Sequence, residues 1–135
     1  MGVSWREDLT VGVGPIDEQH RELFKKADEL AEAARSGKGS EYVSGLLGFL
    51  EDYTRFHFGE EETYMAGIGY PELAAQKAMH ADFMKQVAAL REEFARSGGS
   101  FSIVVKANQT VVGWLIRHIS FEDKKIGRFA AQAGK

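Results

Sequence analysis

The four histidines of this 135-residue chain constrain its fold more than any other feature. Each lies in its own segment of apolar residues that recur at steps of three and four, the spacing of one face of an α-helix. The four are His20, His57, His80 and His118. One histidine on such a face is usually a core residue bonded to a carbonyl, but one on each of four successive faces is improbable by chance. The pattern therefore predicts four helices that share a core containing imidazole groups.

Three short breaks rich in glycine and serine or in glycine and proline separate the four segments. They span residues 36–40, 67–71 and 97–100. Asp17 is a suitable N-cap for the first helix. Helices of roughly five turns joined by short loops predict an all-α fold, an antiparallel up-down-up-down four-helix bundle that forms one domain over residues 1–135. A short N-terminal arm, residues 1–15, precedes the bundle, and Trp5 is expected to pack on it.

Composition excludes several classes of function. The formal net charge is −3 with acidic and basic residues interspersed, so no basic stripe is available for nucleic acid or an anionic membrane. No apolar run approaches the roughly 18 residues of a membrane span, and the first residues lack the apolar core of a signal peptide. A cytoplasmic protein is the expectation. Because the chain has no cysteine, any metal must be held by nitrogen and oxygen donors.

Two carboxylates make a metal site the preferred interpretation of these histidines. Glu61 lies one helical turn beyond His57 on the same apolar face, where a buried ionised carboxylate costs on the order of several kcal/mol unless it is paired or bound to metal. Asp123 follows His118 by five residues, a step of about 140° on an ideal helix. Either the helix is locally distorted there or the carboxylate reaches in from its edge. Two carboxylates that can bridge favour two ions of iron, manganese or zinc over one.

Each of these features has a simpler interpretation when it is taken alone. His57 and Glu61 have the spacing of an ordinary ion pair on a helix surface. The glutamates at positions 60–62 would usually form a solvated face, and Trp114 would be ordinary core. The conjunction of four inward histidines with inward carboxylates favours metal over these alternatives.

Four stretches of the sequence together resemble the hemerythrin family, and its bacterial single-domain members most closely. They are GVGPIDEQH at 12–20, YTRFHFGEEETYM at 53–65, YPELAAQKAMH at 70–80 and WLIRHISFED at 114–123. The resemblance implies two non-haem iron ions, Fe²⁺ or Fe³⁺, bridged by an oxo or hydroxo group and able to bind O₂ reversibly. It favours an oxygen-binding protein over an enzyme.

Site residues carry over from the family one motif at a time. The implied metal ligands are His20, His57, Glu61, Gln76, His80, His118 and Asp123. In this assignment His20 and His57 serve the oxygen-binding iron, the other two histidines serve its partner, and the two acidic residues bridge the ions. The implied pocket for the small ligand is lined by Phe58, Trp114, Leu115 and Ile119.

Gln76 is the departure from the family pattern, which has a histidine four residues before His80. A glutamine amide oxygen is a weaker, neutral ligand than imidazole. Gln76 either coordinates feebly, holds a water at the position, or does not bind. One hypothesis is therefore an O₂-binding protein with an altered partner-iron site, in which the glutamine is a tolerated or engineered substitution. The alternatives are a peroxidase or NO-handling enzyme, whose open position also admits azide-like anions, and a bundle with impaired di-metal binding. The sequence does not fix the oligomeric state.

Overall fold

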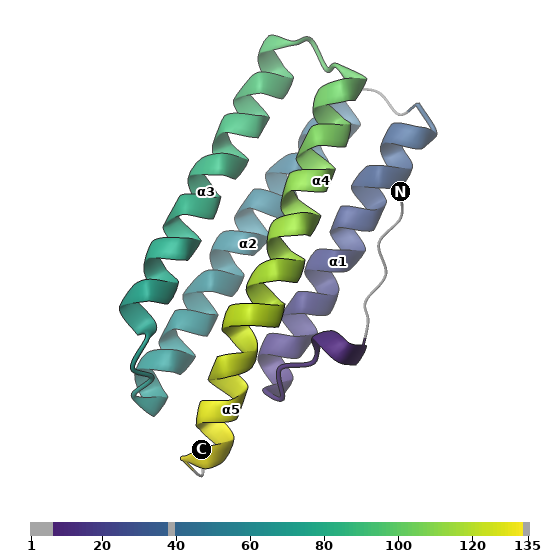
Figure 1. The fold of residues 1–135 in the computed structure, drawn as a ribbon. Helices are drawn as coiled ribbons and strands as arrows, with labels where there is room; N and C mark the ends of the chain where they lie inside the picture. Colours follow the sequence, from purple (N-terminus) through teal and green to yellow (C-terminus); the bar gives the residue numbers. More distant parts are fainter. Residues whose placement is uncertain (1–6, 38–39, 134–135) are drawn as a thin grey trace.

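Four long helices run alternately up and down in the computed structural model, which describes residues 7–37 and 40–133 (Figure 1). They are α1 (Gly14–Arg35), α2 (Ser40–Ile68), α3 (Leu73–Arg96) and α4 (Phe101–His118). A short 3₁₀ turn, η1 (Glu7–Leu9), precedes them. The fourth helix continues through a π-helical segment, η2 (Ile119–Asp123), into α5 (Lys124–Gln132). The predicted all-α four-helix bundle is confirmed, and neither described range contains a strand.

The helices pack in a ring, with α1 and α3 each lying between α2 and α4. The predicted apolar stripes form the core, and its largest fully buried side chains include Phe24, Leu30, Leu50 and Phe83. Burying a side chain of this size stabilises the folded state by about 1.5–3 kcal/mol. Within residues 7–37 and 40–133, no helix is long and apolar enough to cross a membrane.

Several predicted boundaries differ from the structure. The first helix begins at Gly14, so Asp17 lies in its first turn and the N-cap prediction is wrong. The second helix continues through Gly67 and ends at Ile68. The chain then turns at Gly69, whose φ of +69° suits a residue without a side chain. No predicted helix covers α5. The prediction for Trp5 lies outside the described residues.

The segment between η1 and α1 is fastened at two points. The buried Asp17 carboxylate accepts the backbone N–H groups of Val11, at 2.7 Å, and Gly12, at 3.1 Å. On the other side, Gly127 of α5 approaches the same segment so closely that a Cβ atom there would lie 1.9 Å from the carbonyl oxygen of Val11. This packing fixes α5 against the start of α1, and so holds the end of η2, where Asp123 lies.

Candidate metal centre

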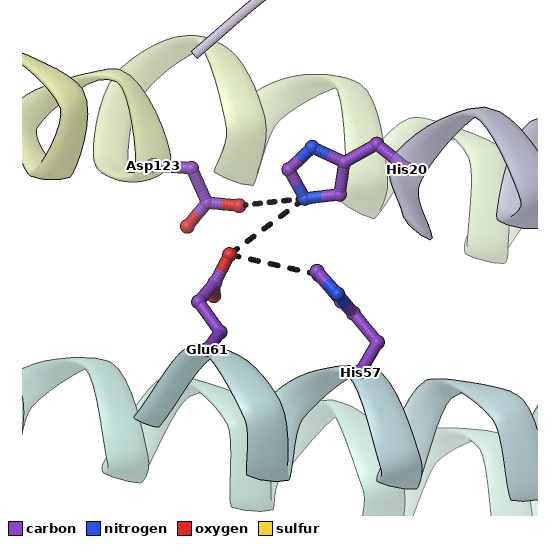
Figure 2. Close-up of side chains that lie close together, drawn as sticks. All are labelled: His20, His57, Glu61 and Asp123. Atoms are coloured by element: carbon purple, nitrogen blue, oxygen red, sulfur yellow. Dashed lines mark ion pairs between the residues drawn. The ribbon is translucent and has the colours of Figure 1, made fainter. Parts of the chain in front are cut away.

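Two groups of buried donor atoms meet in the core, and they share two carboxylates. The first donor group is His20 from α1, His57 and Glu61 from α2, and Asp123 from η2 (Figure 2). The second donor group is Glu61, His80 from α3, His118 from α4, and Asp123. Within each group the ligand atoms all lie within 4.8 Å of one another. The structure thus brings together every histidine of the chain and both predicted bridging carboxylates.

Glu61 presents one oxygen to each donor group. Its Oε2 lies 3.6 Å from Nε2 of His57 and 3.7 Å from Nε2 of His20, whereas its Oε1 lies 3.1 Å from Nε2 of His80.

Asp123 divides its oxygens in the same way. Its Oδ2 lies 3.2 Å from Nε2 of His20, and its Oδ1 lies 3.2 Å from Nε2 of His118. A carboxylate whose two oxygens face different sets of nitrogen donors has the arrangement needed to bridge two cations.

The π-helical segment explains how Asp123 reaches this position. On a regular α-helix a five-residue step would turn it about 140° away from His118. In a π-helix the hydrogen bonds run from residue i to i+5, so five residues complete about one turn. His118 is 5% exposed and Asp123 is 1% exposed, so both face the interior. Of the two explanations considered for this spacing, the local helix distortion is correct.

Five of the donor atoms are buried without the hydrogen bonds that such atoms normally make, as far as the described residues go. Nε2 of His20, His80 and His118 and both oxygens of Glu61 have no hydrogen-bond partner among the described residues. Leaving a buried polar atom unsatisfied costs about 1–3 kcal/mol. Cations held by imidazole nitrogen and carboxylate oxygen would satisfy all five atoms at once, and this donor set is one that iron accepts. The residues present therefore fit a pair of metal ions.

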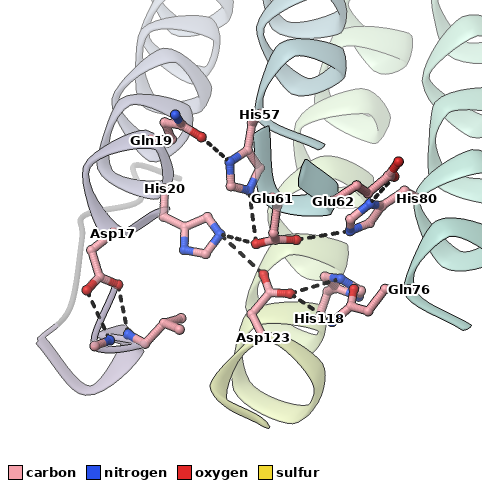
Figure 3. A network of polar contacts seen from close by, with 12 residues as sticks. Asp17, Gln19, His20, His57, Glu61, Glu62, Gln76, His80, His118 and Asp123 are labelled. Atoms are coloured by element: carbon pink, nitrogen blue, oxygen red, sulfur yellow. Dashed lines mark hydrogen bonds and ion pairs between the residues drawn. The ribbon is translucent and has the colours of Figure 1, made fainter. Parts of the chain in front are cut away.

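Two of the histidines are held from behind by polar side chains (Figure 3). Nδ1 of His57 lies 2.8 Å from Oε1 of Gln19, and Nδ1 of His80 lies 2.8 Å from Oε2 of Glu62. An N–H that donates from Nδ1 leaves the Nε2 lone pair directed into the site, which is how metal-binding histidines are usually oriented. These two supporting residues were not predicted.

Aromatic rings cover the second donor group. The Phe58 ring stacks on His80, with centroids 3.8 Å apart and planes 2° from parallel, and the Trp114 ring stacks on His118 at 4.3 Å and 14°. Leu115 and Ile119 are fully buried in the same apolar cluster as Phe58. The predicted pocket residues thus belong to the core around the site, and two of them contact its histidines.

Gln76 lies on the side of the second donor group. It is 1% exposed, its Nε2 donates to Oδ1 of Asp123 at 3.3 Å, and its Oε1 is buried with no hydrogen-bond partner in the part of the chain that the structure describes. Of the two polar atoms of the amide, Nε2 therefore makes a hydrogen bond and Oε1 makes none with the described residues.

Without bound metal, burial and the close carboxylates shift the pKa values of the donor residues in different directions. Burial opposes the charged form of His20, but the close carboxylates of Asp123 and Glu61 outweigh it and raise its pKa to about 9. Burial dominates at His57 and lowers its pKa to about 4. The pKa of Asp123 falls well below its ordinary value because, despite burial, it faces His118 and His20. A metal entering the first donor group at neutral pH must therefore displace a proton from His20 but not from His57.

Comparison with known proteins also indicates a cation-binding helical domain. A family model described as the hemerythrin HHE cation binding domain matches residues 11–130. A bacteriohemerythrin of Stenotrophomonas maltophilia (strain R551-3) is 33% identical over 120 residues, covering 89% of this chain and 76% of that protein. One from Methylococcus capsulatus (strain Bath) is 35% identical, covering 89% of each. A crystal structure of wild-type hemerythrin superposes with a TM-score of 0.84 at 30% identity, covering 93% of this chain and 95% of that one.

Proposed function

Because this chain belongs to the hemerythrin family, whose members bind a di-iron centre, we propose that it holds two iron ions in its two donor groups and binds O₂ there. His20 and His57 hold one ion, His80 and His118 hold the other, and Glu61 and Asp123 join them. When bound, the iron pair supplies the electrons that reversible O₂ binding requires. The family model spans most of the chain, which supports residues 1–135 as a single hemerythrin-like domain.

The observation that carries this proposal is the division of the two carboxylates between the donor groups. A single ion would need one oxygen from each carboxylate and would leave the other oxygens, with one pair of histidines, buried and unsatisfied. Because Oε1 and Oε2 of Glu61 face different histidines at 3.1–3.7 Å, two ions satisfy the donor set and one does not.

The remaining residues of the site orient the donors and exclude water. Gln19 and Glu62 fix the imidazole rings of His57 and His80 through their Nδ1 atoms. Phe58 and Trp114 stack on the rings of the second donor group, and a dry site strengthens the electrostatic hold of the carboxylates on a cation. These oriented donors and apolar rings support the surroundings of the two donor groups as the place where a small ligand binds.

An optical titration tests the proposal. The protein is loaded with ferrous iron under anaerobic conditions, exposed to O₂ and then placed under vacuum. Reversible binding predicts an absorption band that appears with O₂ and disappears under vacuum. If the protein holds two irons but O₂ oxidises them irreversibly, a carrier function is excluded. If the protein holds no iron, the result supports the alternative of a bundle with impaired di-metal binding.

A second candidate function rests on Gln76. Its Oε1, buried and without a hydrogen-bond partner among the described residues, is a weak neutral donor where imidazole is expected, so the second metal would keep an exchangeable position. Peroxide, NO or azide-like anions could then reach that metal, which favours turnover over storage. Consumption of peroxide or NO over many cycles by the iron-loaded protein, when an external electron donor is supplied, would support this enzyme. A reaction that stays strictly stoichiometric with the donor present would exclude it.

A further inference from the structure

Gln76 of α3 donates a hydrogen bond to Asp123 of η2, and bound metal would not displace this contact. Its Nε2 lies 3.3 Å from Oδ1 of Asp123. The other polar contacts of this carboxylate in the described structure are with Nε2 of His20 and Nε2 of His118, each at 3.2 Å. A histidine nitrogen that binds metal has no proton to donate, so both of these contacts would be replaced by the ions. A carboxylate oxygen can hold a cation on one lone pair and accept an N–H on the other, so the Gln76 contact can remain.

The same kind of support recurs around the ring of helices (Figure 3). In three pairs a polar side chain of one helix holds a donor residue on the next helix along the chain: Gln19 with His57, Glu62 with His80, and Gln76 with Asp123. The first two supporting residues contact a histidine from behind and belong to neither donor group. By its place in this series, Gln76 is a third supporting residue.

The carboxylate fixes the orientation of the Gln76 amide. An ionised carboxylate only accepts hydrogen bonds, so Oδ1 of Asp123 attracts the amide N–H and repels the amide oxygen. A reversed amide would set two acceptor oxygens against each other. Gln76 is 1% exposed, so bulk water offers its N–H no competing acceptor. The N–H group therefore faces the bridging carboxylate, and the amide oxygen is turned away from Oδ1.

The orientation of Asp123 affects both donor groups. Its Oδ2 faces His20 of the first group, and its Oδ1 faces His118 of the second. The two oxygens are attached to one carbon, so rotation of the side chain moves both of them. A hydrogen bond that holds Oδ1 consequently holds Oδ2 as well. Loss of this bond should disturb both metal positions, although Gln76 lies on the side of the second.

We propose that Gln76 is a positioning residue for the bridging carboxylate of Asp123 and is not a metal ligand. The proposal rests on the proposed function, since it requires Asp123 to join two ions. Each ion then has two imidazoles and one oxygen from each carboxylate. The exchangeable position at the second metal stays open, because the amide donates to Asp123 instead of filling it. The histidine expected at this position would bind one metal directly, whereas Gln76 acts on both metals through Asp123.

A competitive titration with Zn²⁺ and a chromophoric chelator tests this role. Zn²⁺ accepts imidazole and carboxylate donors and has no redox chemistry of its own. Gln76→Leu removes the N–H group, and loss of a group that supports a ligand weakens metal binding about 10–100-fold. We expect both equivalents of Zn²⁺ to bind more weakly by such a factor. If one equivalent weakens and the other is unchanged, Gln76 acts as a ligand of one metal, and the proposal is wrong.

Gln86→Leu is the matched control. Gln86 is exposed on the same helix, and its Nε2 also donates to an aspartate, Asp82, at 2.9 Å. The side chain lies outside both donor groups. Both equivalents of Zn²⁺ should bind this variant as they bind the parent. Equal weakening in Gln86→Leu and Gln76→Leu would mean that any glutamine on α3 has this effect, and it would overturn the specific role of Gln76.

Nuclear magnetic resonance of the side-chain amides detects the hydrogen bond itself, with or without metal. The Nε2 protons of Gln76 should exchange slowly with solvent in the metal-free and the Zn²⁺-loaded chain, and their shifts should move in Asp123→Asn, which lacks the carboxylate. Protons that exchange as fast as those of Gln86 would overturn the proposal. So would a carbonyl carbon of Gln76 that shifts on loading far more than that of Gln19, since Oε1 would then bind the metal.

The metal-free measurement separates this proposal from the two-ion proposal. A parent that binds fewer than two Zn²⁺ ions while the Gln76 amide is protected would count against the two-ion site, and the hydrogen bond to Asp123 would still be supported. A parent that binds two ions while the amide exchanges rapidly would support the site and overturn the role of Gln76.

Discussion

Gln76 stands where the resemblance to hemerythrins implies another imidazole for the second donor group. The amide uses its Nε2 on Asp123 and leaves Oε1 buried without a partner in the described structure. Gln76→His would add a stronger donor one helical turn before His80, on the same face of α3. We expect the variant to bind its second metal more tightly, to form a longer-lived O₂ adduct and to lose any peroxide or NO turnover that the parent shows.

Metal titration and the decay rate of the O₂ adduct measure these effects. Gln76→Ala is the control, because it removes the amide without adding an imidazole and should bind the second metal no better than the parent. Equal metal affinity, adduct lifetime and turnover in the parent and Gln76→His would show that the glutamine has no bearing on function.

Two histidines of the first donor group shift the stability of the metal-free protein with pH in opposite directions. The pKa of His20 is raised from 6.5 to about 9, so its contribution to stability is complete below pH 6.5 and is lost as the pH rises toward 9. The pKa of His57 is lowered from 6.5 to about 4, so its contribution is present above pH 6.5 and is lost as the pH falls toward 4. The free energy of unfolding without metal should therefore be greatest near pH 6.5.

Denaturant unfolding of the metal-free protein between pH 4 and pH 9 measures this profile. His20→Gln should flatten the decline on the alkaline side, because the proton held by the imidazole is then absent. A free energy of unfolding that climbs steadily to pH 9 would contradict the assignment of a raised pKa to His20.

At the scale of single elements, the continuous helix formed by α4, η2 and α5 positions the bridging Asp123. The α5 end of this helix is held where Gly127 packs against the carbonyl oxygen of Val11. Gly127→Ala would force this contact apart, and we expect it to lower the free energy of unfolding by about 1–3 kcal/mol, as overpacking usually does. Gly113→Ala is the control within α4, since its Cβ would meet only the movable end of Arg117 at 3.4 Å. Equal unfolding midpoints for the two variants would show that the arm does not constrain α5.

The elements that follow a helical period were predictable from sequence, and those that interrupt it were not. Steps of three and four place His20, Glu61 and His80 on buried faces, and the structure buries all three. The spacing of His118 and Asp123 signalled a distortion but could not identify the π-helix, because that depends on backbone hydrogen bonds rather than on side-chain pattern. Nothing marks the start of α5 either, since no glycine or proline separates it from η2.

Contacts between distant residues were the other unpredictable part. Gln19 supports His57 from 38 positions away, and Glu62 supports His80 from 18 positions away. Both supporting residues sit next to a donor residue in sequence, but only the packing of neighbouring helices shows which histidine each one holds. Asp17 has the residue type of an N-cap, and its actual partners lie before the helix.

At the scale of the whole molecule, the metal site lies in the core and stability should depend on it. Without metal, clustered carboxylates and imidazoles remain buried and poorly satisfied between all four long helices. A metal that binds only the folded state adds stability by mass action, about 2.7 kcal/mol when its concentration is 100 times Kd. Removing iron with a chelator should therefore lower the thermal unfolding midpoint. An iron-free protein as heat-stable as the loaded one would argue for a bundle that does not use the site.

The number of iron ions bound per chain tests the two-ion bridge most directly. The parent, Glu61→Ala and Asp123→Ala are loaded with ferrous iron anaerobically, freed of excess metal and analysed for iron, with circular dichroism to verify that each is folded. The bridge predicts two irons per chain in the parent and fewer than two in each variant. The reason is that each of the two carboxylates supplies one oxygen to the first donor group and its other oxygen to the second. Two irons retained in a folded Glu61→Ala or Asp123→Ala variant, or only one bound by the parent, would contradict it.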